Sequence, residues 1–321
     1  MVDLNRGVKL IVETCMEVKP GETILIIADN YARPMRIAEA VMEEVLAVGA
    51  EALILVKTQG RTHGTEPSKP VAAAMKAADS ALYISDKFGI GQTSARQEAT
   101  AVGLKWFNMM GMSEDDLARD ISAADIMLVR DNTEKLAERL TQAKSAKVTS
   151  AAGTSLTMSL EGRQGLAVHP MSGNLIALVP DYGEATIAPV EGTAEGVIVV
   201  DAEIIGWGFV LMEPLRLSVR AGRVVDISGP AEDAERLRQL AAADENANNI
   251  AEFAMGTSHL VSNLRGTRRD AGIAGTVHIA IGRNDTIGGV TQSSIHVDGL
   301  LTRVSVELDG KQVLRDGVFQ V

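Results

Sequence analysis

The sequence is poor in cysteine and in aromatic residues. Its 321 residues include one cysteine, Cys15, so no intramolecular disulfide and no Cys-x-x-Cys metal site can form, which predicts a reducing, cytoplasmic location. Aromatic residues make up 3%, and the formal net charge is −11. A nucleic-acid-binding protein needs a basic face and usually stacking rings, so both shortages argue against a nucleic-acid partner.

Long hydrophobic runs are also absent. The longest, such as residues 23–28 and 206–212, fall far short of the roughly 20 residues that span a bilayer. Residues 1–6 lack the basic start and apolar stretch of a signal peptide. With 46% hydrophobic and 23% charged residues, the composition is that of a globular protein, and we expect no membrane partner.

The first 150 residues alternate short apolar runs with helical patterns. Residues 23–28 form a continuous β-branched run, as expected of a parallel strand that is covered on both faces. Further strands are predicted at 52–56, 81–85 and 104–107, and helices at 34–48, 71–78, 93–102, 113–123 and 133–143. Repeated βα units predict an α/β, Rossmann-like domain with an open, mostly parallel sheet over residues 1–150.

The second part, residues 151–321, has short alternating strands separated by glycine-rich turns. The clearest alternation is at residues 215–219, and a turn at Asp309-Gly310 predicts a closing hairpin. One polar helix is predicted at 231–243. The pattern therefore predicts an α+β domain over residues 151–321.

A His-x-Asp pair provides the sharpest functional signal. On a strand, His296 and Asp298 share one face, so imidazole and carboxylate can enter the same site and hold a divalent metal. His278 interrupts an apolar strand at residues 275–282, and a buried polar ring without a partner costs roughly 1 to 3 kcal/mol. The alternatives are a surface dipeptide formed by chance and a core histidine with an ordinary hydrogen-bond partner.

Two acids stand in comparable surroundings. Glu252 is the one acid among small and apolar residues at 249–256, and Glu184 opens a strand after a turn. Taken separately, such acids are more often solvated than catalytic.

In order, these residues resemble the metal-ligand series of the M29 metallo-aminopeptidases, the aminopeptidase T family. The resemblance covers nearly the whole chain, including residues 95–103, 153–156, 183–189 and 251–257. It implies a homodimer and a catalytic second domain holding a pair of divalent ions, Zn, Co or Mn. The implied ligands here are Glu184, Glu252, His278, His296 and Asp298. The family also has a tyrosine seven residues after the first histidine, where this chain has Asp285.

A second branch of the superfamily differs in its chemistry. The compact segment from His278 to Asp298 resembles that of the 2,5-dihydroxypyridine 5,6-dioxygenases, which bind one Fe(II) through two histidines and one carboxylate. That branch has histidine where Glu252 stands here. Glu252 therefore favours hydrolysis.

Three functions follow, in order of preference. The first is a metal-dependent hydrolase of the aminopeptidase T type that cleaves an amide bond in a peptide or other small molecule with metal-activated water. Glu184 or Glu252 would act as general base, and Arg216 and Asp285 could orient the substrate. The second is a ring-cleaving Fe(II) dioxygenase using His278, His296 and Asp298. The third is a non-catalytic binding protein on the same fold.

Overall fold

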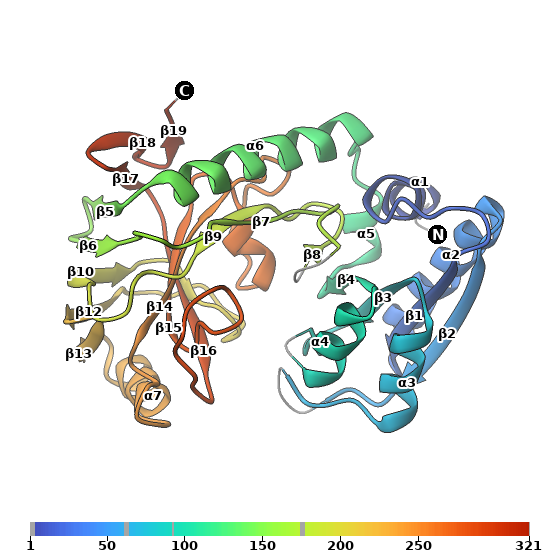
Figure 1. Cartoon of the computed structure of the whole chain (residues 1–321), viewed down its shortest axis with the longest axis horizontal. Coiled ribbons are helices and arrows are strands. Elements are labelled where there is room, and N and C mark those ends of the chain that lie inside the picture. Colours follow the sequence, from blue (N-terminus) through green and yellow to red (C-terminus); the bar gives the residue numbers. More distant parts are fainter. Residues whose placement is uncertain (1–3, 61–63, 92, 174–176, 321) are drawn as a thin grey trace. The chain divides into compact units, whose positions relative to one another are not determined.

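The computed structural model describes residues 4–60, 64–91, 93–173 and 177–320 (Figure 1). The chain forms two compact units: Met1–Arg130 with Val168–Tyr182, and Asp131–Ala167 with Gly183–Val321. These limits differ from the predicted division into two domains at residue 150. The chain returns to the first unit after residue 168 because Leu178 pairs with Asn108 in the parallel sheet.

The first unit contains a five-stranded parallel sheet with the order β2-β1-β3-β4-β8. Helices α3 and α4 pack their apolar residues, Val71, Met75 and Ala99, against one face, and α2 packs on the other (Figure 1). Helix α2 ends at Gly49, whose positive φ of 89° is readily adopted by glycine. The strands are β1 (Thr23–Asp29), β2 (Glu51–Lys57), β3 (Ser80–Ser85), β4 (Lys105–Met110) and β8 (Ala177–Leu178). The helices are α1 (Asn5–Lys9), the π-helix η1 (Leu10–Cys15), α2 (Ala32–Val48), α3 (Lys69–Ala77), α4 (Ser94–Ala101) and α5 (Glu114–Leu117).

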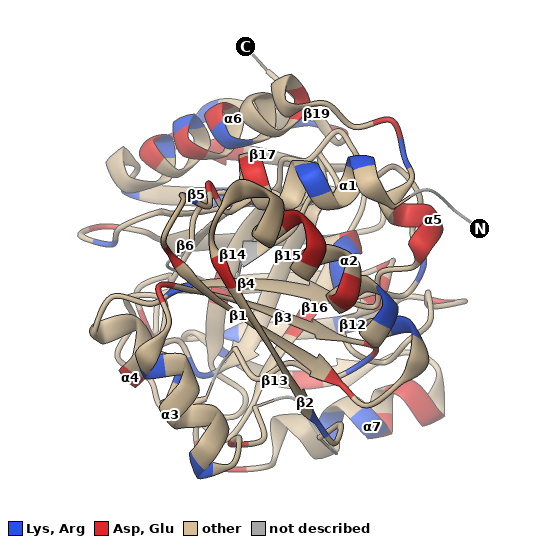
Figure 2. Ribbon diagram, turned by 90° about the vertical axis from the view of Figure 1, so that its right-hand side faces the viewer, with Lys and Arg blue, Asp and Glu red and all other residues tan. Residues whose placement is uncertain are grey.

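The predicted helices at 113–123 and 133–143 were wrong in their limits. Helix α5 is a single turn started by a capping box of Ser113 and Asp116. A second Ser-x-x-Asp pair follows, in which Ser122 and Asp125 exchange hydrogen bonds and start helix α6 (Ala123–Gln142). Acidic and basic residues are mixed along α6 (Figure 2).

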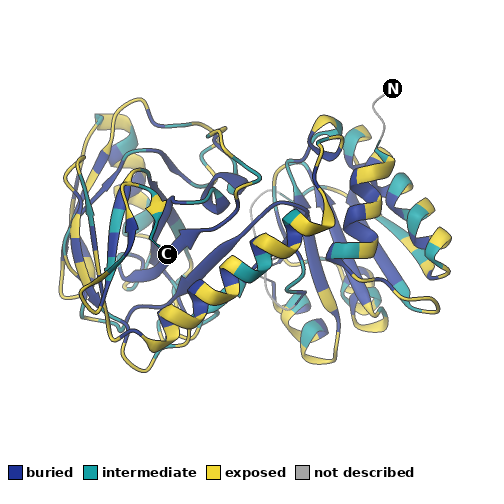
Figure 3. Ribbon diagram, turned by 90° about the horizontal axis from the view of Figure 1, so that it is seen from above, coloured by how far each residue is buried: buried dark blue, intermediate teal, exposed yellow. Residues whose placement is uncertain are grey.

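The second unit contains two sheets with a shared core. The eight-stranded sheet has the order β13-β12-β10-β6-β5-β17-β18-β19, and the six-stranded sheet has the order β11-β16-β15-β14-β9-β7. Apolar residues of both sheets, such as Ile198 and Phe253, form one core with Leu140 of α6 and Leu237 of α7 (Ala231–Ala241). Figure 3 shows that this interior is buried and that α6 is exposed on its outer side.

The strands of the eight-stranded sheet are β5 (Ser145–Ser150), β6 (Ser155–Ser159), β10 (Glu195–Val200), β12 (Leu215–Arg220), β13 (Arg223–Ser228), β17 (Val304–Leu308), β18 (Lys311–Arg315) and β19 (Val318–Phe319). Those of the six-stranded sheet are β7 (Leu166–Val168), β9 (Glu184–Ile187), β11 (Glu203–Ile204), β14 (Ile250–Gly256), β15 (Val277–Gly282) and β16 (His296–Leu301), near the 3-10 helix η2 (Arg268–Gly272). The chain thus has a mixed α/β fold with one parallel sheet and two further sheets built from antiparallel pairs. None of the described helices is both long enough and apolar enough to cross a membrane.

Candidate metal centre

One face of the six-stranded sheet packs into the core, and the other carries polar residues. Phe253 and Ile279 lie in the core, so Glu252 and His278, their neighbours in sequence, project from the opposite face. The pairing register extends this alternation across four adjacent strands. It places all five predicted metal ligands on the same face: Glu184 on β9, Glu252 on β14, His278 on β15, and His296 and Asp298 on β16.

A β-bulge adjusts the position of Glu252. Ile250 pairs with Ile281 and Glu252 with Ala280, and the register shifts between these two pairs. Because of this shift Ile250 joins the core while Glu252, two residues later, projects from the polar face. Bulges commonly re-aim a side chain in this way beside functional sites.

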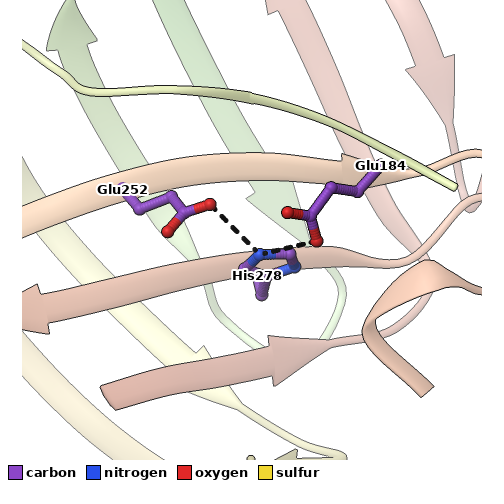
Figure 4. Close-up of side chains that lie close together, drawn as sticks. All are labelled: Glu184, Glu252 and His278. Atoms are coloured by element: carbon purple, nitrogen blue, oxygen red, sulfur yellow. Dashed lines mark ion pairs between the residues drawn. The ribbon is translucent and has the colours of Figure 1, made fainter. Parts of the chain in front are cut away.

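Glu184, Glu252 and His278 form the first group of potential ligands (Figure 4). Nε2 of His278 lies 3.6 Å from Oε2 of Glu184 and 3.6 Å from Oε1 of Glu252, slightly beyond hydrogen-bonding distance. Neither nitrogen of the fully buried His278 ring has a hydrogen-bond partner among the described residues. The ring is therefore held between two carboxylates without an ordinary hydrogen bond.

Glu252, His296 and Asp298 form a second group. Nε2 of His296 lies 2.8 Å from Oε2 of Glu252 and 3.0 Å from Oδ1 of Asp298. Nδ1 of His296 lies 2.9 Å from the carbonyl oxygen of Arg283, and since a carbonyl can only accept, Nδ1 must carry a proton. In the neutral ring the lone pair of Nε2 would face two carboxylate oxygens, so the arrangement needs either a second proton on Nε2 or a bound metal ion.

The electrostatics of the site agree with this requirement. Burial by itself would raise the pKa of Glu252, but His278 and His296 hold it below its ordinary value. Burial would lower the pKa of His296, yet Asp298 and Glu252 raise it well above its ordinary value. The same opposition between burial and neighbouring carboxylates leaves the pKa of His278 raised. The site therefore attracts positive charge, which can be a proton or a metal ion.

The donor set fits a divalent metal. Each of the two groups has its potential ligand atoms within 4.8 Å of one another, and Glu252 belongs to both. Imidazole nitrogen and carboxylate oxygen are the ligands expected for Zn, Mn or Fe(II). The carbonyl of Arg283 orients the His296 ring, as backbone carbonyls often do for ligating histidines. The unpartnered nitrogens of His278 support the same assignment.

Two neighbours of the ligands were not found from the sequence. Thr186 donates its hydroxyl proton to Oε1 of Glu252, and Arg268 contacts Oδ2 of Asp298. Thr186 follows Glu184 by two residues, so the alternation of a strand could have placed both on one face. Arg268 follows an irregular segment, and no sequence pattern indicates its contact.

Glu203 is a third residue missed from the sequence. It lies on β11 opposite Leu300, and therefore on the same face as the ligands. Its side chain is fully buried, and neither carboxylate oxygen has a hydrogen-bond partner among the described residues. Burial, together with the nearby charges of Asp270 and Asp298, raises the pKa of Glu203 to about 8 against the opposing effect of Arg268.

The two predicted substrate-orienting residues lie outside both groups. Asp285 accepts hydrogen bonds from the side chain of Arg283, the residue whose carbonyl binds His296. Asp285 therefore adjoins the site through Arg283. Arg216 is exposed on β12, a strand of the eight-stranded sheet. The structure does not bring Arg216 to the cluster.

Comparison with protein families gives a match over almost the whole chain. The model of the 2,5-dihydroxypyridine 5,6-dioxygenase family, NicX, matches residues 9–321. The chain therefore belongs to this family of enzymes. A search of curated proteins found no significant match.

Two solved structures share the fold along nearly their full length. The 2,5-dihydroxypyridine dioxygenase of Pseudomonas putida KT2440 is 18% identical, with a TM-score of 0.83, covering 99% of this chain and 97% of that one. AmpT of Thermus thermophilus is 19% identical, with a TM-score of 0.74 and 99% coverage of both chains. The superfamily predicted from the sequence, which unites the M29 aminopeptidases with the dihydroxypyridine dioxygenases, is thereby confirmed.

Proposed function

We propose that this chain is a metal-dependent hydrolase that cleaves an amide bond in a peptide or another small molecule. The observation that carries the proposal is the position of Glu252, which belongs to both groups of potential ligands. An additional carboxylate at the centre of the cluster suits a hydrolytic site of one or two divalent ions. It is not needed by a site that requires two histidines and one carboxylate.

In this function His278, His296, Asp298 and at least one of Glu184 and Glu252 would bind the metal, and the face of the sheet fixes their positions. A bound divalent ion would polarise the scissile carbonyl and lower the pKa of water. The hydroxyl of Thr186 holds Oε1 of Glu252, and the Arg283 carbonyl holds the ring of His296 with Nε2 directed at the carboxylates. Glu184 or Glu252 would accept the proton released from water.

The second candidate is a ring-cleaving Fe(II) dioxygenase, which the family match and the likeness to the Pseudomonas putida enzyme favour. Its ligands would be His278, His296 and Asp298. These three do not form a group of mutually close ligand atoms in the described part of the chain, whereas both groups that do form contain Glu252. For this reason we place the hydrolase first.

One set of measurements separates the candidates. Protein purified without added metal is analysed for bound metals, then assayed for oxygen uptake with dihydroxypyridines and for hydrolysis of a panel of aminoacyl anilides, dipeptides and N-acyl amines. The hydrolase predicts amide cleavage without oxygen uptake, lost on chelation and restored by Zn, Co or Mn.

Oxygen uptake that depends on Fe(II), without amide cleavage, would overturn the hydrolase in favour of the dioxygenase. Absence of both activities would favour a non-catalytic binding protein. His296→Ala is the control, because any activity that arises at this site must disappear with a ligand removed from it.

A further inference from the structure

The first unit contains a cavity at the carboxyl ends of its parallel strands. It has a volume of about 540 Å³ and is lined by residues that follow β2 and β3, among them Thr58 and Phe88, and by the start of α3. In the strand order β2-β1-β3-β4-β8, the chain passes from β1 to β2 on one side of β1 and then crosses to β3 on its other side. Ligands of open α/β sheets bind at such a point, outside the carboxyl ends of the strands.

One residue of the cavity lining, Lys57, belongs to a buried ion pair. Nζ of Lys57, the last residue of β2, lies 3.0 Å from Oδ1 of Asp29, the last residue of β1. Asp29 is fully buried, and its other oxygen accepts a hydrogen bond from Gln59 at 3.2 Å. A buried ion pair is often no more stabilising than apolar residues of the same volume, so stability alone does not explain a pair whose lysine lines a cavity.

Lys57 has donor capacity left for a ligand. Its ammonium group carries three protons, and the described residues provide two acceptors, Asp29 Oδ1 at 3.0 Å and the hydroxyl of Tyr83 at 3.2 Å. The side chain is 13% exposed and lines the cavity. Asp29 and Tyr83 thus hold the lysine in place while the third proton can be donated into the cavity.

The remaining lining combines apolar and polar side chains, and its one described acid, Glu66, accepts hydrogen bonds from the backbone N–H groups of Ser94 and Ala95. Val71, Phe88 and Ile90 supply apolar surface, and Ser68 also lines the cavity. Ser68 is also the N-cap residue of α3, and its side chain makes no capping hydrogen bond. A hydroxyl at the start of a helix and a lysine ammonium group each suit a negatively charged acceptor.

We propose that this cavity binds a small carboxylic acid, whose carboxylate accepts a hydrogen bond from Lys57 while its apolar part packs against Val71, Phe88 and Ile90. The site lies entirely within the first unit and uses none of the candidate metal ligands. It is independent of the reaction proposed for the second unit.

The test uses the metal-loaded full-length chain and two matched pairs of probes, hexanoate with hexanamide and benzoate with benzamide, titrated by isothermal calorimetry. We expect saturable binding of at least one acid, and binding of its amide weaker by about tenfold or more, because the amide offers no charge to Lys57. Thr58→Trp places a large side chain at an exposed position of the lining and should abolish binding.

Asp29→Asn combined with Lys57→Met removes both charges together and should weaken acid binding by about tenfold or more. Circular dichroism verifies that this variant folds. Lys76→Met, on the same helix α3 but outside the lining, is the control and should bind as the wild type does. The proposal is overturned if no acid binds saturably, if acid and amide bind equally, or if Thr58→Trp binds normally, the last outcome placing the acid elsewhere, such as at the metal centre.

Discussion

Glu203 allows a quantitative test of the electrostatics around the metal centre. In the metal-free protein its pKa rises from an ordinary value of 4.5 to about 8, mainly because the carboxyl is buried. Above pH 4.5 the unfolded chain therefore loses this proton while the folded chain keeps it, so stability falls as pH rises toward 8. Between pH 5 and pH 8 these two pKa values give a loss of roughly 3 to 4 kcal/mol of unfolding free energy from this one group.

The substitution Glu203→Gln removes the titrating group and keeps the size of the side chain. As the pH is raised from 5 to 8, we expect the unfolding free energy of the variant minus that of the wild type to increase by about 3 to 4 kcal/mol. His278 and His296 titrate in both proteins, so their contribution cancels in this difference. Both proteins carry Trp106→Phe, which leaves Trp207 as the one tryptophan and makes its fluorescence a probe of the second unit during urea unfolding.

If the unfolding free energies of the two proteins differ by the same amount at pH 5 and at pH 8, this reasoning is refuted. It would mean that Glu203 ionises at its ordinary pKa and that its carboxylate is solvated or paired in solution. Glu232→Gln, on the exposed surface of α7, is the matched control and should show no such dependence on pH.

Three further outcomes are expected. Thr186→Val removes the hydroxyl that binds Glu252 and should weaken metal binding by roughly 10- to 100-fold in a metal titration. An unchanged metal affinity would show that this hydroxyl does not orient Glu252 for the metal. Metal binding should release protons, because Asp298 and Glu252 raise the pKa of His296 despite its burial. Calorimetry in buffers of different ionisation enthalpy would detect the released protons, and their absence would contradict this expectation. Light scattering at micromolar concentration should give twice the chain mass of 34.0 kDa, and a monomeric mass would reject the homodimer.

Much of the fold could be predicted from local patterns. The β-branched run at residues 23–28 became β1, and Gly49 ended α2 as expected. The error at 113–123 arose because apolar periodicity does not show where one helix stops, whereas two successive Ser-x-x-Asp pairs do. The border at residue 150 missed the return of β8 to the parallel sheet, since pairing between distant strands leaves no local signal.

The candidate site could be predicted only in part. The i and i+2 spacing placed His296 and Asp298 on one face, and His278 stood out because it interrupts an apolar strand. Glu203 could not be found because a two-residue strand has no readable alternation, so nothing in the sequence distinguishes it from a solvated acid. Arg216 showed a clear alternation, but the strand belongs to the other sheet of the second unit.

The most direct test of the central claim is the turnover of Glu252→Gln at saturating metal, measured beside His296→Ala. The substitution keeps the shape of the side chain and removes the charge that both groups of ligands share. The account predicts that Glu252→Gln abolishes turnover, as His296→Ala does, while its circular dichroism spectrum and thermal unfolding remain those of the wild type. Retention of roughly a tenth of the activity by Glu252→Gln, with none left in His296→Ala, would show that Glu252 only orients other ligands and would contradict the hydrolase in favour of the dioxygenase.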